Sequence, residues 1–537
     1  MTQPLLLVEN LQLHLGSRPL LQDISFSLQP GQTLGLVGES GSGKTLLARS
    51  LLGILPPGAT LSGSLTFAGQ DLHDPQVLLR VRGSRIGMIF QEPGAALNPL
   101  YTAEFHLLET LRCHKKLSLG QARQRARQLL AEVNLPETVL HRYPHQLSGG
   151  QQQRLLIALA LAGDPELLLA DEPTTALDVT IQAQIMALLQ NLQQQRHMAL
   201  IFITHDLALL SQLTDQMLVL CQGRLVEQGC LSAPQHPYTQ GLLACRPPLD
   251  RVLHRLPTLR DPQEVRVVSE QEQWQRWQQL QSQAPLLSVR QLTTVFRVPG
   301  GEIRAVNGLS FDLYPGETLG IVGESGSGKS TLARTLLHLV PAKQGQVFFQ
   351  GQPWRPTRAR RRQIQMIFQD PYNALNPRLT VGAAILEPML VHRLVPNPQA
   401  GAAQVQTLLQ HVGLEPDAAQ RYPNQFSGGQ RQRIAIARAL ACQPLLLICD
   451  ECVSALDVSI QAQILNLLKD LQTTFQLTYI FISHDLSVVR FLADRVLVLR
   501  HGQPVELAPA PSLYRDPQQD YTRQLLAAVP QLQRPCG

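Results

Sequence analysis

One glycine-rich motif occurs twice in this sequence and constrains it more than any other feature. The two copies are Gly38-Glu39-Ser40-Gly41-Ser42-Gly43-Lys44-Thr45 and Gly323-Glu324-Ser325-Gly326-Ser327-Gly328-Lys329-Ser330. Each copy follows a strand-like apolar run, at 33–37 or 318–322, and precedes a helix-like segment. In such a loop, N–H groups point at phosphate oxygens, the lysine reaches the β- and γ-phosphates, and the last hydroxyl can bind Mg²⁺. The chain is therefore expected to bind a nucleoside triphosphate, at two sites.

The length and composition favour a globular protein of at least two domains. The chain has 537 residues, of which 44% are hydrophobic and 16% are charged, and this is too long for one core. The N-terminus has no signal-peptide pattern, and no apolar run approaches the roughly 18 residues of a membrane span. Eight scattered cysteines indicate a reducing compartment rather than a disulfide framework. The net charge of +6 permits contact with an anionic membrane surface or nucleic acid but argues for neither.

The repetition extends far beyond the glycine-rich motif. Further residues recur in the same order and at a nearly constant spacing: Gln91 with Gln369, Ser148 with Ser427, Asp171 with Asp450, Asp178 with Asp457, and His205 with His484. Such a constant spacing indicates that one ancestral domain was duplicated in tandem. We expect a first domain at 1–252, a linker at 253–284 and a second domain at 285–537.

The linker is rich in glutamine and has no lysine. Trp274, Trp277 and Leu280 would share one face if this segment formed a helix. That pattern favours docking of the linker against a domain, and a flexible linker is the alternative.

Candidate catalytic residues follow apolar strands in both halves. Continuous apolar runs at 167–170 and 445–449 fit a parallel sheet that is buried on both faces. Each ends in an acidic pair, and a histidine follows the next strand; these residues are Asp171, Glu172 and His205 in the first half and Asp450, Glu451 and His484 in the second. We expect the aspartates to hold Mg²⁺ and the glutamates to take a proton from water as general bases. The histidines could bond the γ-phosphate and hold the water or the glutamate in place.

Two further polar motifs belong to this hypothesis. Gln91 and Gln369 each end a strand-like run and could bind Mg²⁺ or the attacking water. The second motif is Ser148-Gly149-Gly150-Gln151, repeated as Ser427-Gly428-Gly429-Gln430. Its serine is a good helix N-cap, and its glycines leave N–H groups open to an anion. A flexible hinge before a helix is the alternative interpretation of that motif.

Taken together, these motifs resemble two ATP-binding cassette domains of transporters fused in one chain. The resemblance implies an α/β fold of two tandem P-loop NTPase domains, each with a RecA-like core, an antiparallel β subdomain and a helical subdomain. It implies ATP and Mg²⁺ as cofactors, with metal ligands Thr45, Gln91, Asp171, Ser330, Gln369 and Asp450. In that family two domains close head to tail on two ATP molecules. Carried over, Lys44 would face Ser427 and Gly429, and Lys329 would face Ser148 and Gly150.

Other segments narrow the resemblance to importers of oligopeptides, dipeptides and nickel. These segments are Gln91-Glu92-Pro93 with Leu97-Asn98-Pro99, Gln369-Asp370-Pro371 with Leu375-Asn376-Pro377, and His236-Pro237-Tyr238-Thr239 with its weaker echo Gln519-Asp520-Tyr521-Thr522. The resemblance implies an ATPase on the cytoplasmic face of the inner membrane, peripheral to two permease subunits and served by a solute-binding protein. Its cargo stays open among peptides, a peptide-like antibiotic, glutathione and a nickel chelate.

The sequence departs from the family pattern at three places. Leu15 stands where the second half has Phe296, so adenine stacking would be weaker at the first site unless His14 substitutes. Cys449 and Cys452 form a C-x-x-C, for which two small buried residues are the favoured interpretation over a redox or zinc role. Only Cys245 follows the HPYT segment, so no iron–sulfur centre is expected.

Two alternatives to a peptide importer remain at this point. A tandem cassette ATPase acting on ribosomes or nucleic acid would share the layout, but such proteins usually carry a long, charged linker. A sugar importer often has one degenerate site, whereas neither site looks degenerate here.

Overall fold

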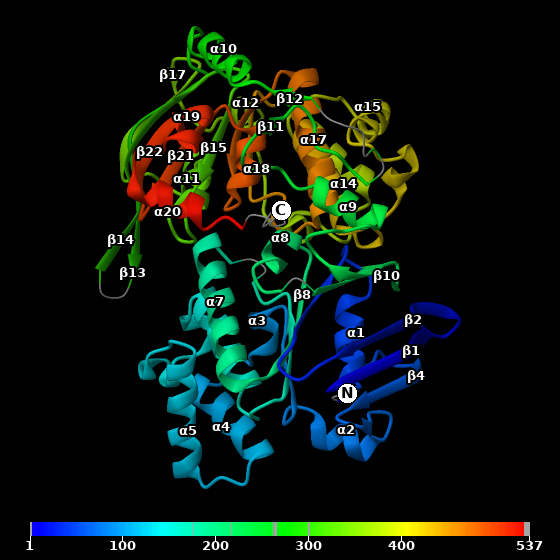
Figure 1. The fold of residues 1–537 in the computed structure, drawn as a ribbon. Coiled ribbons are helices and arrows are strands. Elements are labelled where there is room, and N and C mark those ends of the chain that lie inside the picture. Colours follow the sequence, from blue (N-terminus) through cyan, green and yellow to red (C-terminus); the bar gives the residue numbers. More distant parts are fainter. Residues whose placement is uncertain are drawn as a thin grey trace. The chain divides into compact units, whose positions relative to one another are not determined.

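The computed structural model describes residues 3–174, 177–214, 216–259, 261, 266–298 and 301–530, except for the side chain of Asn373. It divides into two compact units, one made mostly of Met1–Leu243 and the other of Ala244–Val529 (Figure 1). Within each unit, a parallel core sheet, an antiparallel group of strands and a helical segment follow the same order along the chain. The expected α/β fold of two tandem domains is therefore confirmed.

The core of unit 1 is a parallel sheet in the order β6-β7-β8-β3-β9, extended by the antiparallel strand β10. Its strands are β3 (Thr33–Val37), β6 (Ile86–Ile89), β7 (Leu167–Asp171), β8 (Ala199–Thr204), β9 (Gln216–Cys221) and β10 (Arg224–Cys230). The central strands β7 and β8 are buried at every position, which explains why they read as unbroken apolar runs. In this sheet the carboxyl ends of β3, β7 and β8 lie side by side, so residues that follow these strands are brought together.

The antiparallel strands of unit 1 join the core sheet through β2 and β10. They are β1 (Leu6–Leu15), β2 (Arg18–Leu28), β4 (Ala59–Phe67) and β5 (Gln70–Asp71). Their inner faces bury Leu and Ile side chains together with Phe67 against α1 (Lys44–Leu51). The helix that begins inside the glycine-rich loop is thus fixed by packing on both neighbouring layers.

The helical segment of unit 1 lies between β6 and β7 in sequence, away from the antiparallel strands (Figure 1). The helices of unit 1 besides α1 are α2 (Pro75–Val81), α3 (Pro93–Ala96), α4 (Ala103–His114), α5 (Leu119–Glu132), η1 (Glu137–His141), η2 (Pro144–Gln146), α6 (Gly149–Ala160), α7 (Val179–Arg196), α8 (Leu207–Leu210) and α9 (Pro237–Ala244). Side-chain caps fix several helix starts: Thr102 caps α4, and Ser118 forms a capping box with Gln121 at α5.

Unit 2 repeats this arrangement with two separate sheets. The core order is β18-β19-β20-β15-β21-β22 and the antiparallel order is β14-β13-β16-β17. The strands are β13 (Leu287–Val298), β14 (Gly301–Leu313), β15 (Thr318–Val322), β16 (Gln344–Phe349), β17 (Gln352–Pro353), β18 (Ile364–Ile367), β19 (Leu446–Asp450), β20 (Thr478–Ile482), β21 (Arg495–Arg500) and β22 (Gln503–Pro509). The strand expected at 445–449 is β19, displaced by one residue.

The helices of unit 2 follow the same sequence order. They are α11 (Lys329–Leu336), α12 (Arg358–Arg361), α13 (Pro371–Ala374), α14 (Val381–Val391), α15 (Pro398–His411), η3 (Pro416–Gln420), η4 (Pro423–Gln425), α16 (Gly428–Leu440), α17 (Val458–Phe475), α18 (Leu486–Leu492), α19 (Ala510–Arg515) and α20 (Asp520–Ala527). The last of these, α20, carries the echo of the HPYT segment.

The segment between the two repeats belongs to unit 2, and its described residues are held there by polar contacts. It contains β11 (Val252–Leu253), β12 (Val267–Val268) and α10 (Glu270–Gln281). The side chain of Asn466, on α17, bonds both the N–H and the C=O of Leu256 at 2.8 Å. Arg255 forms two bonds with the Asp470 carboxylate at 2.9 and 3.0 Å.

The helix α10 is attached through a second group of contacts. Arg276 donates to Asp494 at 2.6 Å. Trp277 meets Tyr314 edge to face, and the Arg495 guanidinium stands 4.5 Å above the Trp277 ring. The Gln-rich segment is therefore docked onto unit 2.

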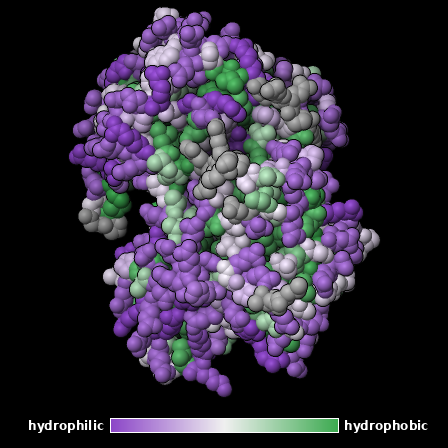
Figure 2. Space-filling view, viewed as in Figure 1, coloured by the Kyte–Doolittle hydropathy of each residue, from purple (hydrophilic) through white to green (hydrophobic). Residues whose placement is uncertain are grey.

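Hydrophilic residues cover much of the molecular face in view, and hydrophobic residues appear there in small groups (Figure 2). Across the described ranges, none of the helices combines the length and the apolar character needed to span a membrane.

Candidate active site

The first glycine-rich loop joins β3 to α1 and holds its lysine inside the fold. Gly38, Gly41 and Gly43 have φ values of 152°, 77° and 106°. A side chain at Gly38 would place a Cβ 2.2 Å from the Leu220 carbonyl oxygen, so only glycine fits there. Lys44 is 5% exposed, and its Nζ donates to the carbonyls of Gly38 at 2.8 Å and Glu39 at 2.9 Å. The loop therefore curls around its own lysine.

The second loop, between β15 and α11, repeats this geometry. Lys329 Nζ donates to the carbonyls of Gly323 at 2.6 Å and Glu324 at 2.9 Å. A Cβ at Gly323 would lie 2.2 Å from the Leu499 carbonyl oxygen. Both sequence-predicted loops thus have the same conformation in the structure.

Each loop also buries a hydroxyl that fits a phosphate-binding role. Ser42 and Ser327 are 4% and 3% exposed, and within the described part of the chain their Oγ atoms have no hydrogen-bond partner. A buried hydroxyl without a partner costs free energy, which a bound phosphate oxygen would recover. The loops therefore suit an oxygen-rich anionic ligand.

The structure brings the expected Mg²⁺ ligands together at the edge of each core sheet. Thr45 Oγ1 donates to Asp171 Oδ1 at 3.1 Å, and Ser330 Oγ donates to Asp450 Oδ1 at 2.9 Å. Burial, with the nearby charge of Glu172, raises the pKa of Asp171 to about 6. Burial likewise raises the pKa of Asp450. A cation here would offset that burial cost.

The donor set fits Mg²⁺ in chemistry but supplies only part of a coordination shell. Hydroxyl, carboxylate and amide oxygens are its preferred ligands, and Mg²⁺ usually keeps waters and binds substrate phosphates besides one or two carboxylates. Among the described residues, no cluster of three or more His, Cys, Asp or Glu could hold a metal alone. The residues present therefore suit a metal that arrives with a phosphate ligand.

A glutamine, a glutamate and a histidine meet beside each aspartate. In unit 1, Gln91 Nε2 donates to Glu172 Oε2 at 2.9 Å, and His205 Nδ1 lies 3.5 Å from Glu172 Oε1. In unit 2 the three residues are Gln369, Glu451 and His484, with corresponding distances of 2.8 and 3.7 Å. The three elements that end at this edge of the sheet thus converge on one carboxylate.

Both glutamates have an unusual backbone conformation, and charged neighbours shift the pKa of Glu451. Burial opposes ionisation of Glu451, but the hydrogen bond and charge of His484, with the charge of Lys329, lower the pKa of Glu451 overall. Glu451 is therefore ionised at neutral pH, as a proton acceptor must be. Glu172 and Glu451 have φ values of 45° and 47°, in the left-handed region that side chains rarely adopt.

The Ser-Gly-Gly-Gln motifs begin α6 and α16 as capping boxes. Ser148 Oγ accepts from Gln151 N at 3.3 Å, and the Gln151 side chain accepts from Ser148 N at 3.1 Å. Ser427 and Gln430 form the same pair at 3.4 and 3.0 Å. The third motif residue, Gly150 or Gly429, packs against an isoleucine, because a Cβ would lie 2.9 or 2.4 Å from its Cγ2. The expected pairing of each motif with the glycine-rich-loop lysine of the other unit stays a prediction.

Among the other residues that the sequence singled out, Phe296 and Leu15 are exposed, and Cys449 and Cys452 are buried. Phe296 and Leu15 are 41% and 42% exposed, near the ends of β13 and β1. An exposed aromatic side chain at this position is available for stacking. Cys449 and Cys452 are buried, and their mutual hydrogen bond, with burial, raises the pKa of the Cys449 thiol. This environment fits two small core residues.

Sequence reasoning did not assign a role to the tyrosine of the HPYT segment. Glu39 N donates to the Tyr238 hydroxyl at 3.3 Å, and that hydroxyl donates to Glu39 Oε2 at 3.1 Å. In unit 2, Glu324 N donates to the Tyr521 hydroxyl at 3.3 Å. The recurrence of Tyr-Thr after each core domain was the available signal, but nothing in it identifies the glycine-rich loop as the partner.

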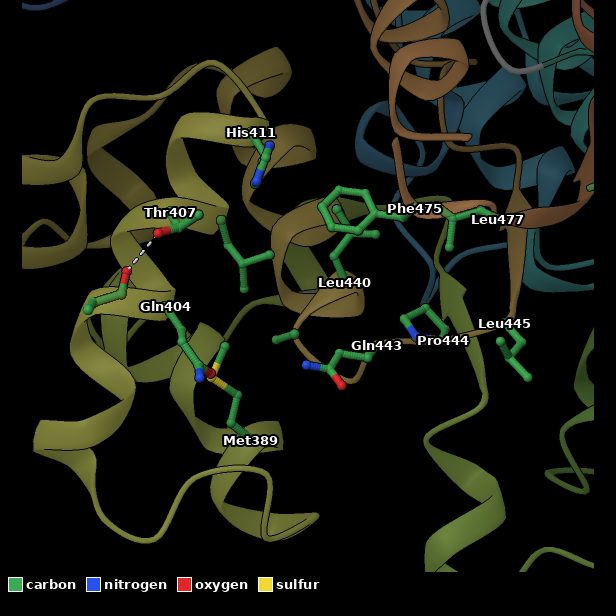
Figure 3. Close-up of a pocket in the computed structure, with 13 residues that line it drawn as sticks. Met389, Gln404, Thr407, His411, Leu440, Gln443, Pro444, Leu445, Phe475 and Leu477 are labelled. Atoms are coloured by element: carbon green, nitrogen blue, oxygen red, sulfur yellow. Dashed lines mark hydrogen bonds between the residues drawn. The ribbon is translucent and has the colours of Figure 1, made fainter. Parts of the chain in front are cut away.

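A pocket of about 410 Å³ lies elsewhere in unit 2, near residues that precede β19 and β20 (Figure 3). Side chains of α15, among them Thr407 and His411, face Phe475 and Leu477 across it (Figure 3). Asp450 ends β19, and Glu451 and His484 follow the opposite, carboxyl ends of β19 and β20. The pocket is therefore separate from the candidate active site.

The matching place in unit 1 holds a cluster of charged side chains. Asp164 accepts from Arg125 and Arg196 at 2.9 Å each, and also pairs with Lys115. Glu132 pairs with the same two arginines. In the alignment of the repeats, Asp164, Glu132 and Arg196 correspond to Gln443, His411 and Phe475. The repeats have thus diverged here while their glycine-rich loops stayed alike.

Comparison with known proteins gives two family matches. The family model described as "ABC transporter" matches residues 21–175 and 306–454. The model described as "Oligopeptide/dipeptide transporter, C-terminal region" matches residues 227–271 and 505–537.

Individual proteins are similar over most or part of the chain. The glutathione import ATP-binding protein GsiA of Escherichia coli (strain K12) is 46% identical over 547 residues, covering 95% of this chain and 86% of that protein. The protein of the same name from Shigella boydii serotype 4 (strain Sb227) is 47% identical over 543 residues, with the same coverage. A solved structure of the ATP-binding cassette MJ0796, dimeric and bound to ADP and Pi, is 28% identical with a TM-score of 0.38. It covers 42% of this chain and 98% of that chain.

Proposed function

This chain belongs to the ABC transporter family, and on that premise we propose that it powers the import of a peptide-like solute by hydrolysing ATP at two sites. One observation carries the proposal. In each unit, a buried lysine, a hydroxyl–aspartate pair and a Gln–Glu–His group surround the end of the glycine-rich loop. Two complete sets of this kind suit two working ATPase sites.

The loops bind the triphosphate in this proposal. Backbone N–H groups of the loop and of the helix start point at phosphate oxygens, and Lys44 or Lys329 neutralises the β- and γ-phosphates. Thr45 with Asp171, and Ser330 with Asp450, would hold Mg²⁺, which would supply positive charge to offset that of the phosphates. Gln91 and Gln369 contribute an amide oxygen to the metal or the water.

The glutamates perform the proton transfer. Glu172 or Glu451 accepts a proton from the water that attacks the γ-phosphorus, while the adjacent glutamine fixes the carboxylate. His205 or His484 lies close enough to the glutamate to hold it in place and to meet the γ-phosphate. Each side chain thus has one role in a reaction that depends mainly on positioning and charge.

In this proposal the Ser-Gly-Gly-Gln motifs complete the two ATP sites when the two halves of the chain close on ATP. In this proposal Ser427 and Gly429 serve the site of Lys44, and Ser148 and Gly150 serve the site of Lys329. The N-termini of α16 and α6 then present backbone N–H groups to the γ-phosphate. Closure and reopening would drive the transport cycle.

The transport partners are two membrane permeases and a solute-binding protein, and the chain acts at the cytoplasmic face of the membrane. The match of 227–271 and 505–537 to an oligopeptide/dipeptide transporter region supports this assignment. Because two relatives that are 46% and 47% identical are named for glutathione import, glutathione is the cargo proposed here.

Purification of the tagged chain in mild detergent tests the proposal. Two polytopic membrane proteins should co-purify and be identified by mass spectrometry. Proteoliposomes containing that complex and the solute-binding protein should take up labelled glutathione only with internal ATP, and unlabelled dipeptides should compete weakly. A chain bearing both Glu172→Gln and Glu451→Gln should abolish uptake.

Two outcomes would contradict the proposed function or the proposed cargo. Recovery of ribosomes or nucleic acid without membrane proteins would exclude an importer. Uptake of dipeptides that glutathione does not inhibit would retain the importer and overturn the cargo.

A further inference from the structure

The C-terminal segment of each unit contacts the glycine-rich loop through a tyrosine hydroxyl. The Tyr238 hydroxyl accepts from Glu39 N at 3.3 Å and donates to the Glu39 carboxylate at 3.1 Å. The carbonyl of this same glutamate accepts from Lys44 Nζ at 2.9 Å. Glu39 therefore links a tyrosine almost two hundred residues away to the lysine expected to bind phosphate.

Unit 2 contains the same contact, made by residues from matching positions. Glu324 N donates to the Tyr521 hydroxyl at 3.3 Å, and Lys329 Nζ donates to the Glu324 carbonyl at 2.9 Å. The Arg500 guanidinium lies 4.6 Å above the Tyr521 ring and helps to fix it. Two copies of one contact argue against an accidental hydrogen bond.

The tyrosine is aimed at the loop by an acidic residue on the last core strand. In unit 1, Glu227 on β10 accepts from Gln235 N at 2.6 Å, just before α9 begins. In unit 2, Glu506 on β22 accepts from Gln518 N at 3.0 Å and from the Thr522 hydroxyl at 2.6 Å. β10 pairs with β9, and β22 pairs with β21. The acidic residue on β10 or β22 therefore fixes the start of the segment that carries the tyrosine.

In the hydrogen bond between Tyr238 and the Glu39 carboxylate, the tyrosine hydroxyl is the donor. Burial and the negative charge of Glu39 raise the pKa of Tyr238, so its hydroxyl stays protonated and can donate. By binding the carboxylate of Glu39, the hydroxyl holds that negative charge at a fixed place beside the loop. A carboxylate free to swing toward the phosphates would repel them.

We propose that Tyr238 and Tyr521 are positioning residues for ATP binding. Each hydroxyl fixes the second residue of the glycine-rich loop, and so presets the carbonyl that orients the lysine. The inference rests on the proposed function, since it assumes that these loops bind ATP. It assigns to the C-terminal segment a role inside the same unit, independent of permeases and cargo.

A binding measurement on the full chain tests this assignment one loop at a time. In a Lys329→Ala background, which restricts ATP binding to the first loop, Tyr238→Phe should weaken the Kd for Mg-ATP about fivefold by calorimetry. Tyr238→Phe removes both hydrogen bonds of the hydroxyl to Glu39, and a fivefold change corresponds to about 1 kcal/mol, within the net contribution expected of such bonds. In a Lys44→Ala background, Tyr521→Phe should act likewise. In the otherwise unchanged chain, either substitution should raise KM for ATP with kcat altered less than KM.

The matched control is Tyr514→Phe. Tyr514 also belongs to unit 2, and its hydroxyl donates to the Leu486 carbonyl at 2.7 Å, outside the glycine-rich loop. Its loss should lower the unfolding temperature without changing the Kd for ATP. An unchanged Kd in Tyr238→Phe and Tyr521→Phe, with a thermal shift like that of Tyr514→Phe, would overturn the inference. Undiminished ATP binding by the Lys44→Ala, Lys329→Ala double variant would instead overturn the proposed ATP sites.

Discussion

Gln369 donates its side-chain amide hydrogen to Glu451 at 2.8 Å. Gln91 and Glu172 form the same bond at 2.9 Å in the other repeat. A glutamine that follows one core strand thus fixes the carboxylate that follows the neighbouring strand. Since both repeats keep this pair, neither site carries the sign of a degenerate ATPase.

Both glutamates should therefore be needed for full hydrolysis. Glu172→Gln and Glu451→Gln should each lower the steady-state ATPase rate by at least about tenfold, because each removes a proposed general base. Phosphate release from the purified chain measures the effect. Glu166→Gln, in a surface pair with Arg85, is the control and should leave the rate unchanged. A rate unaffected by Glu172→Gln but abolished by Glu451→Gln would show that only one site works.

The two sites should differ in how strongly they hold the adenine ring. Phe296 is exposed on β13, whereas Leu15 occupies the matching position on β1. Phe296→Leu should weaken nucleotide binding at the second loop, and Leu15→Phe should strengthen it at the first, each by about 1 kcal/mol. Titration with ATP and with inorganic triphosphate separates the base from the phosphates. Equal changes for both ligands would contradict stacking.

The docked linker should open when its buried amide bonds are removed. Asn466→Ala leaves the N–H and C=O of Leu256 without the partner they have in the structure, at a cost of about 1–3 kcal/mol for each buried group. Limited trypsin digestion should then cut faster after Arg255. Asp470→Asn, which weakens a surface ion pair, should accelerate cleavage much less. Equal cleavage rates in the wild type and Asn466→Ala would refute this docking.

The charge cluster of unit 1 should make its stability sensitive to acid. Burial opposes ionisation of Asp164, but Lys115, Arg125 and Arg196 lower its pKa below the ordinary 3.8. Its contribution is therefore present above pH 3.8 and is lost as the pH falls through the lower folded value.

Asp164→Asn should thus reduce the stability of unit 1 at pH 7 by about 1 kcal/mol or less, and the difference should vanish in strong acid. Thermal unfolding across a pH series measures it. Gln443→Asn, at the matching position of unit 2, should show no such pH dependence. A difference that persisted unchanged in acid would contradict the assigned charge interaction.

The sequence predicted the core strands well because their apolar runs are unbroken. The strands expected at 33–37 and 318–322 have those bounds in the structure. Residues at their carboxyl ends could be grouped in advance, since parallel strands bring those ends to one edge. The hydroxyl–aspartate and Gln–Glu pairs follow from that rule.

Other contacts could not be predicted because they depend on distances that no local pattern records. Tyr238 meets Glu39 only because the segment after β10, which itself runs away from the loop, returns the chain to that edge of the sheet. The two bonds of Asn466 to Leu256 need one side chain to be buried opposite a particular peptide group. Hydrophobic periodicity also does not reveal the pocket of unit 2, at the position where unit 1 has the charge cluster around Asp164.

If Glu172 and Glu451 act as proposed, their left-handed backbone marks two positions where the chain trades stability for activity. A residue with a side chain costs about 1–2 kcal/mol in this conformation, and glycine would relieve most of that strain. Glycine, however, would remove the carboxylate that we propose accepts the proton from water. Selection for a sturdier fold and selection for turnover therefore oppose each other at these two positions, and a stabilising substitution found there would be an inactivating one.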